Sequence, residues 1–481
     1  MSTFLWTRDE VIAATGGKAF GPDWSATGVS IDSRTAAPAD IFVAITGDRF
    51  DGHGFVAQAL AGGVAAAIVN HRPAGVPDAM PLVIVPDTLA ALRALAERAR
   101  ARTHAKLVGV TGSVGKTGTK EMLGAALAAF GATHVNAGNL NNHFGAPLSL
   151  ARMPATTEFA VQELGMNHAG EISPLSVLAR PDVAIITNVE PVHIEFFESE
   201  DGIAEAKCEI LDGLTPDGAI VLNADNRWYD YCRAAARKHG TSRIVSFGRA
   251  EQADARLISV EVTPEGSRVK ASIAGTALTY RLDAVGEHWA INSLGVLACI
   301  DALGLDVHRA AKEISRVTAG RGRGAQVRIT LAEGGSFLLI DESYNASPPA
   351  MRAAFQVMAM SAPEPGARRI AVLGDMRELG NTSAELHAGL AGDLMATRAD
   401  AVFTVGPFMR ELRAELPEHM LQAHGEISQD IAGPVAASVN HGDVVLVKGS
   451  LGTNMAPIVT ALRALSEPPA MVVPPMVVNG H

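Results

Sequence analysis

One segment constrains the fold of this chain more than any other. Residues 108–117 read Val-Gly-Val-Thr-Gly-Ser-Val-Gly-Lys-Thr, and the helix-forming residues Lys120-Glu-Met-Leu-Gly-Ala-Ala-Leu127 follow them. An apolar strand, a glycine-rich turn and a helix in this order predict a phosphate-binding loop on an α/β sheet, because the turn and the helix N-terminus direct N–H groups at an anion. The alternative is a glycine-rich turn without a ligand, since Val110 stands where the Walker pattern has its first glycine.

Each position of the turn has a predicted role. The glycines let the backbone approach phosphate oxygens, the lysine reaches the β and γ phosphates, and the threonine hydroxyl holds Mg²⁺. The predicted ATP-binding loop consists of Gly112, Ser113, Val114, Gly115, Lys116 and Thr117.

The rest of the chain alternates apolar runs with helical periods. At 481 residues it exceeds what one hydrophobic core usually holds. We expect an α/β protein of three domains: a small N-terminal α/β domain (1–85), a central P-loop ATPase domain with a doubly wound, largely parallel sheet (86–318), and a C-terminal Rossmann-like domain (319–481). The run Gly-Arg-Gly-Arg-Gly at 320–324 is a predicted hinge, and a loose tail is expected from Pro468 to His481.

Polar residues follow the predicted strands of the central domain. Glu163 ends one strand, and ligands bind beyond strand ends in open α/β sheets, so it is a candidate metal ligand. His193 follows another strand and would join Glu163 at the same edge, whereas a lone loop histidine is more often structural. The asparagine-rich stretch that contains Asn139 and Asn142 is either an ordered turn or part of the site.

Lys207 occupies an unusual place in a helical pattern. It stands four residues after Ile203, in a stripe that continues with Ile210 and Leu214, and therefore faces inward. A lysine on an inward face is costly unless it is paired or modified. The alternative is a lysine whose stem is buried and whose amine reaches water.

Composition excludes several classes of function. The net charge of −11, without a basic stripe, argues against a nucleic-acid partner. No apolar run is long enough for a membrane span, the N-terminus lacks the plan of a secretory signal, and the three cysteines form no disulfide framework. A cytoplasmic protein is expected.

Together these motifs resemble the Mur ligase family over residues 28–460. Further matches are Ile31-Asp-Ser-Arg34, Gly286-Glu-His-Trp-Ala-Ile-Asn292, Asp341-Glu-Ser-Tyr-Asn-Ala346 and Leu446-Val-Lys-Gly-Ser450. Within the family, Glu163-Leu-Gly-Met-Asn-His168 and Val372-Leu-Gly-Asp-Met-Arg-Glu-Leu-Gly380 are most similar to the MurF type. Leu451 stands where that family frequently has Arg, so the motifs do not identify the group that holds a substrate carboxylate.

The resemblance implies roles for individual residues. Thr117 and Glu163 would hold one Mg²⁺, and a carbamylated Lys207 with His193 would hold a second. Lys116, Lys207, His193 and Arg321 would be the catalytic residues, with Arg321 reaching the γ-phosphate after domain closure. The remaining ATP contacts would come from His288, Asn292, Asp341, Tyr344 and Asn345. Substrate would be bound by Ser33, Arg34, Asn139, Asn142, Asn167 and His168.

The resemblance also implies an activity. An ATP-dependent ligase of this type joins D-alanyl-D-alanine to UDP-N-acetylmuramoyl-tripeptide through an acyl phosphate, in the synthesis of the peptidoglycan precursor, and a monomer is expected. One alternative is a related amide ligase that adds a single amino acid. The other is a P-loop ATPase switch, which would have no use for Lys207 in an apolar stripe.

Overall fold

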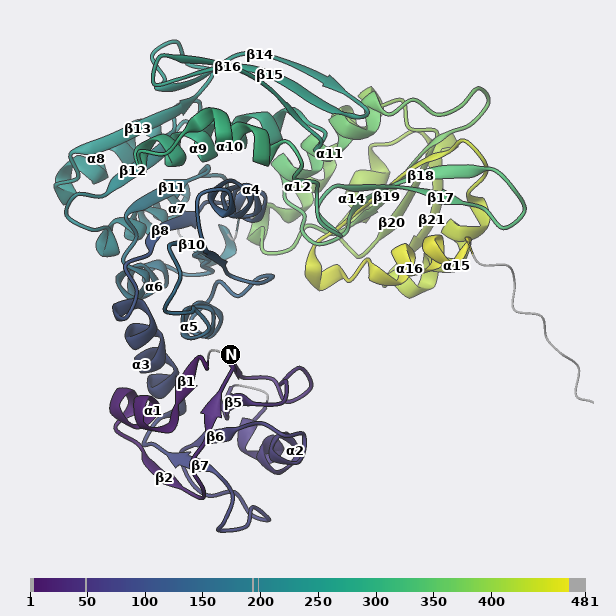
Figure 1. The fold of residues 1–481 in the computed structure, drawn as a ribbon. Helices are drawn as coiled ribbons and strands as arrows, with labels where there is room; N and C mark the ends of the chain where they lie inside the picture. Colours follow the sequence, from purple (N-terminus) through teal and green to yellow (C-terminus); the bar gives the residue numbers. More distant parts are fainter. Residues whose placement is uncertain (1–3, 48–49, 193, 198, 467–481) are drawn as a thin grey trace, which may run out of the picture.

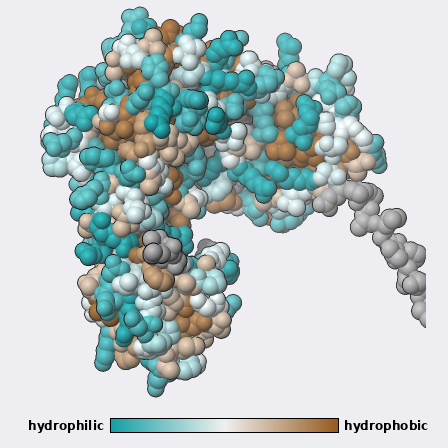
Figure 2. Space-filling view, viewed as in Figure 1, coloured by the Kyte–Doolittle hydropathy of each residue, from teal (hydrophilic) through white to brown (hydrophobic). Residues whose placement is uncertain are grey.

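The computed structural model describes residues 4–47, 50–192, 194–197 and 199–466, which form three α/β bodies with separate sheets. These sheets lie within residues 18–84, 106–282 and 325–448. The bodies follow one another along an arc with the central body at the bend, so the two outer bodies flank an open concave side (Figures 1 and 2). The predicted fold class is confirmed, and the domain limits at 85/86 and 318/319 stay predictions that fall between the sheets.

The N-terminal body has a five-stranded sheet in the order β2-β7-β6-β5-β4, with β2 antiparallel to β7 and the other pairs parallel. Strands β5 and β6 are buried along their whole length, because helices and loops cover both faces. Asp87 caps α3 by accepting the N–H groups of Leu89 and Ala90. The elements are β1 (Trp6–Thr7), α1 (Arg8–Thr15), β2 (Lys18–Phe20), β3 (Ser25–Ala26), β4 (Gly28–Ser30), β5 (Asp40–Val43), α2 (Val56–Ala61), β6 (Ala66–Val69), β7 (Leu82–Ile84) and α3 (Thr88–Ala101).

The central body has a nine-stranded sheet in the order β16-β15-β14-β13-β12-β11-β8-β10-β9. The strands from β9 to β14 are parallel, as predicted, and helices cover both faces (Figure 1). Its first elements are β8 (Lys106–Thr111), α4 (Lys116–Ala128), β9 (Thr133–Val135), α5 (Gly145–Ala151), β10 (Phe159–Glu163), α6 (Ile172–Ala179), β11 (Val183–Ile186), α7 (Glu200–Cys208), β12 (Ala219–Asn223), α8 (Tyr229–His239) and β13 (Arg243–Gly248).

One edge of this largely parallel sheet is antiparallel, a detail that the prediction did not specify. Strands β14 (Ala255–Thr263), β15 (Gly266–Ile273) and β16 (Thr276–Leu282) pair antiparallel to one another. Buried and exposed residues alternate along β15 and β16, so one face packs on the core and the other faces water. The central sheet is therefore mixed rather than purely doubly wound.

Helix α9 (Glu287–Ala302) packs under this sheet against β13, β14 and α4. It is apolar on nearly all sides, which is typical either of a buried helix or of a membrane span, and here α10 (Val307–Ile314) and the sheet bury it. Across the described ranges, no helix combines the length and the apolar character needed to cross a bilayer.

The C-terminal body has a six-stranded sheet in the order β17-β18-β22-β19-β20-β21, with β17 antiparallel to β18 and the other pairs parallel. Strands β19 and β22 are neighbours, but the chain continues from β19 towards β20 and β21 on the other side. That reversal creates a crevice at the strand ends, where open α/β sheets bind ligands. The elements are β17 (Ala325–Thr330), β18 (Ser336–Glu342), α11 (Pro348–Met360), β19 (Arg369–Gly374), α12 (Ser383–Ala388), α13 (Ala391–Ala396), β20 (Ala401–Val405), α14 (Met409–Ala414), β21 (Leu421–Gly425), α15 (Ser428–Ser438), β22 (Val444–Lys448) and α16 (Ala456–Ala464).

Candidate active site

A cavity of about 1700 Å³ lies between the central and C-terminal bodies. Its walls come from the loop between β8 and α4, the end of β10, the start of α9, residues 317–323, and the loops that follow β18, β19 and β22. A site for one small molecule typically measures roughly 300–1,000 Å³. This cavity therefore has room for more than one ligand.

The predicted phosphate loop forms one end of the cavity, and its two glycines are required by close packing. Gly112 has φ +148°, and a Cβ there would lie 1.9 Å from the Thr187 hydroxyl oxygen. Gly115 has φ +86°, and a Cβ there would lie 2.8 Å from Nδ2 of Asn292. Any other residue would be strained at either position and would push the loop off its neighbours.

The residues at the end of β11 hold this loop in place through hydrogen bonds. Asn188 accepts the Ser113 N–H through its carbonyl oxygen and the Val114 N–H through Oδ1, both at 3.0 Å. The Thr187 hydroxyl donates to the Val114 carbonyl at 2.6 Å. Thr187 and Asn188 were not predicted as site residues, although their place at the end of a predicted strand was a usable signal.

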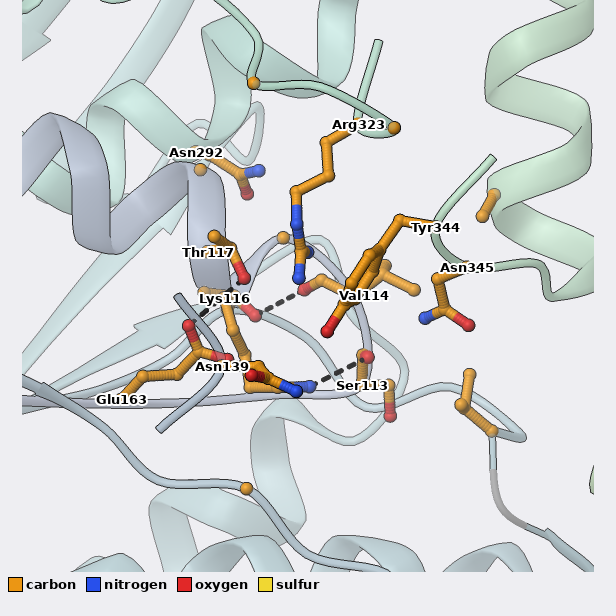
Figure 3. Close-up of a pocket in the computed structure, with 18 of the residues that line it drawn as sticks. Ser113, Val114, Lys116, Thr117, Asn139, Glu163, Asn292, Arg323, Tyr344 and Asn345 are labelled. Carbon is orange, nitrogen blue, oxygen red and sulfur yellow. Dashed lines mark hydrogen bonds between the residues drawn. The ribbon is translucent and has the colours of Figure 1, made fainter. Parts of the chain in front are cut away.

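Thr117 of the loop faces Glu163, whereas the Lys116 amine bonds back to the loop (Figure 3). The Thr117 hydroxyl donates to Oε2 of Glu163 at 3.1 Å, and Glu163 is almost fully buried at the end of β10. The Lys116 amine donates to the carbonyl oxygens of Gly112 at 2.5 Å and Ser113 at 3.1 Å. Burial is the main cause that lowers the pKa of Lys116, with Glu163 opposing the shift and Arg323 adding to it.

The asparagine-rich stretch divides into three different roles. Asn141, which the sequence analysis did not select, donates from Nδ2 to Oε1 of Glu163 at 2.8 Å and so orients the carboxylate. Asn142 accepts the N–H groups of Phe144 and Gly145 at the start of α5, and it also lines the cavity. Asn139 lines the cavity beside Lys116 and Glu163 (Figure 3).

Lys120 holds the asparagine-rich stretch in place. Its side chain is fully buried, and its amine donates to the carbonyl oxygens of Asn136 and Gly138, both at 3.0 Å. The N–H of Glu163 donates in turn to Oδ1 of Asn136 at 2.8 Å. The helix that follows the phosphate loop thus also positions the loop that carries Asn139 and Asn141.

Lys207 lies on the last turn of α7 and is only 2% exposed, in agreement with the predicted inward orientation. Ile203 and Ile210 beside it are fully buried, whereas Leu214 is half-buried. Among the described residues, no carboxylate lies within 4.0 Å of the Lys207 amine. Burial lowers the pKa of Lys207 well below its usual value, and the positive charge of Lys116 lowers it further.

The other predicted nucleotide contacts lie around the opposite walls. His288 and Asn292 stand one turn apart on α9 and both line the cavity, as their spacing predicted. Tyr344 and Asn345 line it from the loop after β18, across from the phosphate loop (Figure 3). Asp341 is different, because it is buried and accepts the Ser343 hydroxyl at 2.6 Å, so it supports the turn and is not among the residues that line the cavity.

Two arginines of the 320–324 run line the cavity, and only one was predicted to act. The guanidinium of Arg323 lies 3.9 Å from the centre of the Tyr344 ring and points towards the phosphate loop (Figure 3). Arg321 is exposed in the cavity wall and makes no hydrogen bond or ion pair with the described residues. The geometry favours Arg323 as the second cation at the phosphate loop, and the role of Arg321 stays a prediction.

The predicted substrate-binding residues fall in two places. Ser33 and Arg34 follow β4 in the N-terminal body, away from the cavity lining, and Arg34 forms an ion pair with Asp32 at 2.7 Å. Asn167 lines the cavity after β10, and its neighbour His168 contacts Glu171 at 2.9 Å. His193 lies outside the described residues, as does the predicted tail. Within the described residues, no three His, Cys, Asp or Glu side chains gather in a metal-binding group.

Known proteins match this chain over nearly its whole length. Residues 25–100 match the family model "Mur ligase family, catalytic domain", residues 110–300 match "Mur ligase middle domain", and residues 327–451 match "Mur ligase, glutamate ligase domain". UDP-N-acetylmuramoyl-tripeptide–D-alanyl-D-alanine ligase of Bacillus subtilis (strain 168) is 34% identical, over 90% of this chain and 93% of that protein. The enzyme of the same name from Rickettsia prowazekii (strain Madrid E) is 32% identical, over 90% and 94%.

Solved structures give the same result. A crystal structure of MurF from Acinetobacter baumannii has a TM-score of 0.82 and 32% identity, covering 95% of this chain and 98% of that one. MurF ligase from Thermotoga maritima in complex with ADP has a TM-score of 0.76 and 26% identity, covering 91% and 97%. On these matches over all three bodies, the chain belongs to the Mur ligase family.

Proposed function

We propose that the protein is an ATP-dependent ligase that joins D-alanyl-D-alanine to UDP-N-acetylmuramoyl-tripeptide, in the synthesis of the peptidoglycan precursor. The relatives with this activity in their names align over nine-tenths of the chain. The observation that carries the proposal is the arrangement of the cavity. Two cationic side chains, Lys116 and Arg323, meet at one end of a space that is large enough for several ligands, and the buried Lys207 lies close enough to Lys116 to feel its charge.

The reaction needs a better leaving group than hydroxide. A carboxylate oxygen of the tripeptide attacks the γ-phosphorus of ATP, which gives an acyl phosphate and ADP. The amine of the dipeptide then attacks the acyl carbon and loses a proton, and inorganic phosphate leaves from the tetrahedral intermediate. Lys116 and Arg323 would hold the phosphate oxygens throughout the reaction, because Lys116 belongs to the phosphate loop and Arg323 points towards it. The site is partly desolvated, and charges act more strongly there than in water.

The chemistry of the donor set fits Mg²⁺. The Thr117 hydroxyl and the Glu163 carboxylate are hard oxygen donors next to each other, and Asn141 orients the carboxylate. These residues would hold one ion, which when bound neutralises phosphate charge. A second ion would be held by Lys207 as a carbamate with His193.

Several features support carbamylation of Lys207. The neutral amine attacks CO₂ to form a carbamate with release of one proton, and the lowered pKa of Lys207 leaves more of its amine neutral. No carboxylate of the described residues competes for the amine within ion-pair distance. An uncharged or anionic group at this place also removes the repulsion with Lys116.

The remaining parts of the proposal concern the other substrates and the setting. The N-terminal body, with Ser33 and Arg34, would bind the UDP-sugar, and Asn139, Asn142, Asn167 and His168 would help orient the peptide. The protein would act as a monomer. ATP and a nucleotide-linked sugar are both substrates of the cytoplasm, which is where it would work.

A panel of amine donors tests the assignment. Phosphate release is measured with ATP, Mg²⁺ and the UDP-muramoyl tripeptide, and each reaction adds D-Ala-D-Ala, D-Ala, L-Ala or D-Glu. We expect turnover with D-Ala-D-Ala and far weaker turnover with single amino acids. Equal turnover with a single amino acid would instead identify a related amide ligase, and turnover without any amine would identify an ATPase.

A further inference from the structure

The crevice between the ends of β19 and β22 forms the wall of the cavity that belongs to the C-terminal body. Residues 377–378 follow β19, and residues 450–452 follow β22, and both segments line the cavity. This is the point where the strand order of the sheet reverses, which is the usual ligand position in such sheets.

The loop after β19 is fixed by contacts on several sides. The Met376 N–H donates to Nε2 of His387 and the Arg377 N–H donates to the Ser450 hydroxyl, both at 2.9 Å. The Glu378 carbonyl accepts the Glu195 N–H from the central body at 3.3 Å, and Glu378 has φ +63°. A backbone held in this way keeps Arg377 at the cavity wall.

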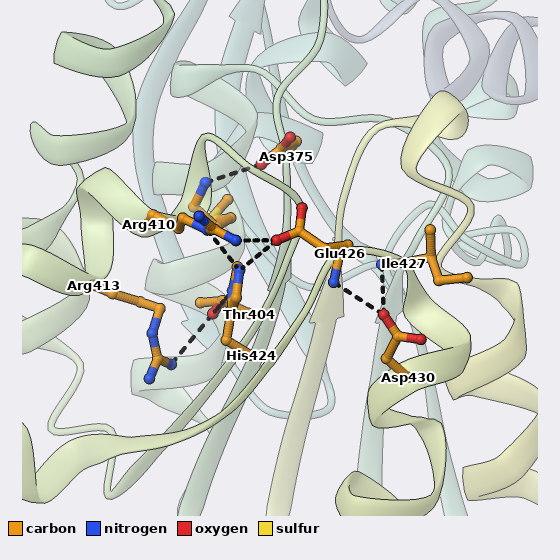
Figure 4. Close-up of polar contacts among 9 residues, drawn as sticks. Asp375, Thr404, Arg410, Arg413, His424, Glu426, Ile427 and Asp430 are labelled. Atoms are coloured by element: carbon orange, nitrogen blue, oxygen red, sulfur yellow. Dashed lines mark hydrogen bonds and ion pairs between the residues drawn. The ribbon is translucent and has the colours of Figure 1, made fainter.

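Arg377 differs from its neighbouring cations because its guanidinium has no hydrogen-bond or ion-pair partner among the described residues. The Lys448 amine donates to the carbonyl oxygen of Asn345 at 2.9 Å and to the carboxylate of Glu342 at 3.3 Å. On α14, Arg410 pairs with Glu426, and Arg413 donates to the Thr404 hydroxyl (Figure 4). Asp375 next to Arg377 is buried under the loop and accepts the Met409 N–H. Arg377 is therefore available for an anion in the cavity.

We propose that Arg377 binds the terminal carboxylate of the D,D-dipeptide, an inference that rests on the proposed function. The dipeptide amine must face the acyl phosphate near Lys116, and its carboxylate lies up to about 7 Å further along an extended chain. A guanidinium suits a planar carboxylate, and Leu451, which is 59% exposed beside it, offers apolar contact to the terminal methyl group. In a single amino acid the carboxylate lies closer to the amine, so the two groups cannot span the same distance as in the dipeptide.

The test compares the dipeptide with its C-terminal amide, which removes the charge and keeps the shape. We expect Arg377→Ala to raise KM for D-Ala-D-Ala by about 10- to 100-fold, because it removes a charged hydrogen bond. KM values for ATP and the tripeptide should stay unchanged. The wild-type preference for the acid over the amide should disappear in Arg377→Ala and return in part in Arg377→Lys. Arg328→Ala, on the outer strand β17 of the same body, is the matched control and should change none of these values.

Two results would overturn the inference. One is an unchanged acid-to-amide ratio of kcat/KM in Arg377→Ala, and the other is loss of that preference in Arg321→Ala instead. Thermal unfolding of each variant shows whether a change in activity reflects a change in folding. If Arg377→Ala does not fold, the preference for the acid over the amide is measured in Arg377→Lys instead. Failure of the proposed function has a different signature, because the wild-type enzyme would then not use D-Ala-D-Ala at all.

Discussion

The two walls of the cavity are built in different ways. In the phosphate wall (Ser113–Thr117, Asn141 and Glu163), Thr117 and Asn141 both donate to the Glu163 carboxylate. The Ser113 hydroxyl and the Lys116 amine donate to backbone carbonyls of the central body. The C-terminal wall (Arg377, Ser450 and Leu451) holds its backbone firmly but leaves Arg377 and Leu451 exposed to the cavity. One wall is preorganised for a ligand that never changes, the phosphates of ATP, and the other is open to the ligand that distinguishes related ligases, the amine donor.

Lys116→Met should show the largest effect, because it removes the central cation of the phosphate wall. We expect kcat to fall by about 1,000-fold or more, since a cation that stabilises phosphoryl transfer contributes on that order. Steady-state phosphate release measures it, and Lys238→Met on the surface of α8 is the control. A fall in kcat of less than tenfold would contradict the claim that the phosphate wall is preorganised for the phosphates of ATP.

Lys207→Ala should follow closely, with a loss in kcat of about 100- to 1,000-fold if its carbamate stabilises charge at the phosphates. A small carboxylate such as acetate should restore part of the activity. Because the pKa of Lys207 is lowered, its free amine stays neutral to lower pH than an ordinary lysine, and only acidification below that pKa protonates it and stops the carbamate from forming again. Added bicarbonate should counter the loss of activity on the acidic side. Intact-protein mass spectrometry with chemical trapping of the carbamate should find one added CO₂, and its absence at full activity would contradict the proposal.

Arg323→Ala and Arg321→Ala form a pair that sharpens the comparison at the junction of the two walls. Arg323 stacks on Tyr344 and faces the phosphate loop, so its loss should lower kcat by about 100-fold. Arg321→Ala should lower kcat by less than about tenfold, since its side chain makes no such contact. If single-turnover rates instead fall more in Arg321→Ala than in Arg323→Ala, then Arg321 rather than Arg323 acts at the phosphates once the bodies have closed.

Asn141→Ala and Asn142→Ala should have the smallest effects, and of different kinds. Asn141 orients Glu163, so its loss should raise the Mg²⁺ concentration for half-maximal rate by about tenfold. Asn142 accepts two N–H groups just before and at the start of α5, so its loss should lower the free energy of unfolding by about 1 kcal/mol. Magnesium titrations and urea denaturation separate the two, and identical responses would show that the stretch acts as one unit.

The sequence predicted the phosphate wall better than the C-terminal wall for a physical reason. Strand, turn and helix are adjacent in sequence around Lys116, so local patterns report the site. Asn141 and Asn188 act across sheet edges, and such amides in loops have no local signal that separates them from ordinary turn residues. Lys120 shows no signal either, because its burial depends on the loop that it holds.

Two other outcomes depended on tertiary structure. Gly-Arg-Gly-Arg-Gly offers two arginines in equivalent settings, and only the position of Tyr344 shows why Arg323 rather than Arg321 faces the phosphate loop. The antiparallel strands β14–β16 were missed even though polar and apolar residues alternate in 276–282, because the surrounding strand–helix alternation favoured a parallel sheet.

Transfer of oxygen tests the central claim most directly. The tripeptide is prepared with ¹⁸O in the carboxylate that becomes acylated, and the released phosphate is analysed by mass spectrometry after reaction with ATP and D-Ala-D-Ala. Formation of an acyl phosphate and its attack by the amine predict one ¹⁸O atom in each released phosphate, in equal amount to the new amide. Phosphate without label, formed at the same rate with or without the dipeptide, would contradict the account and identify an ATP hydrolase.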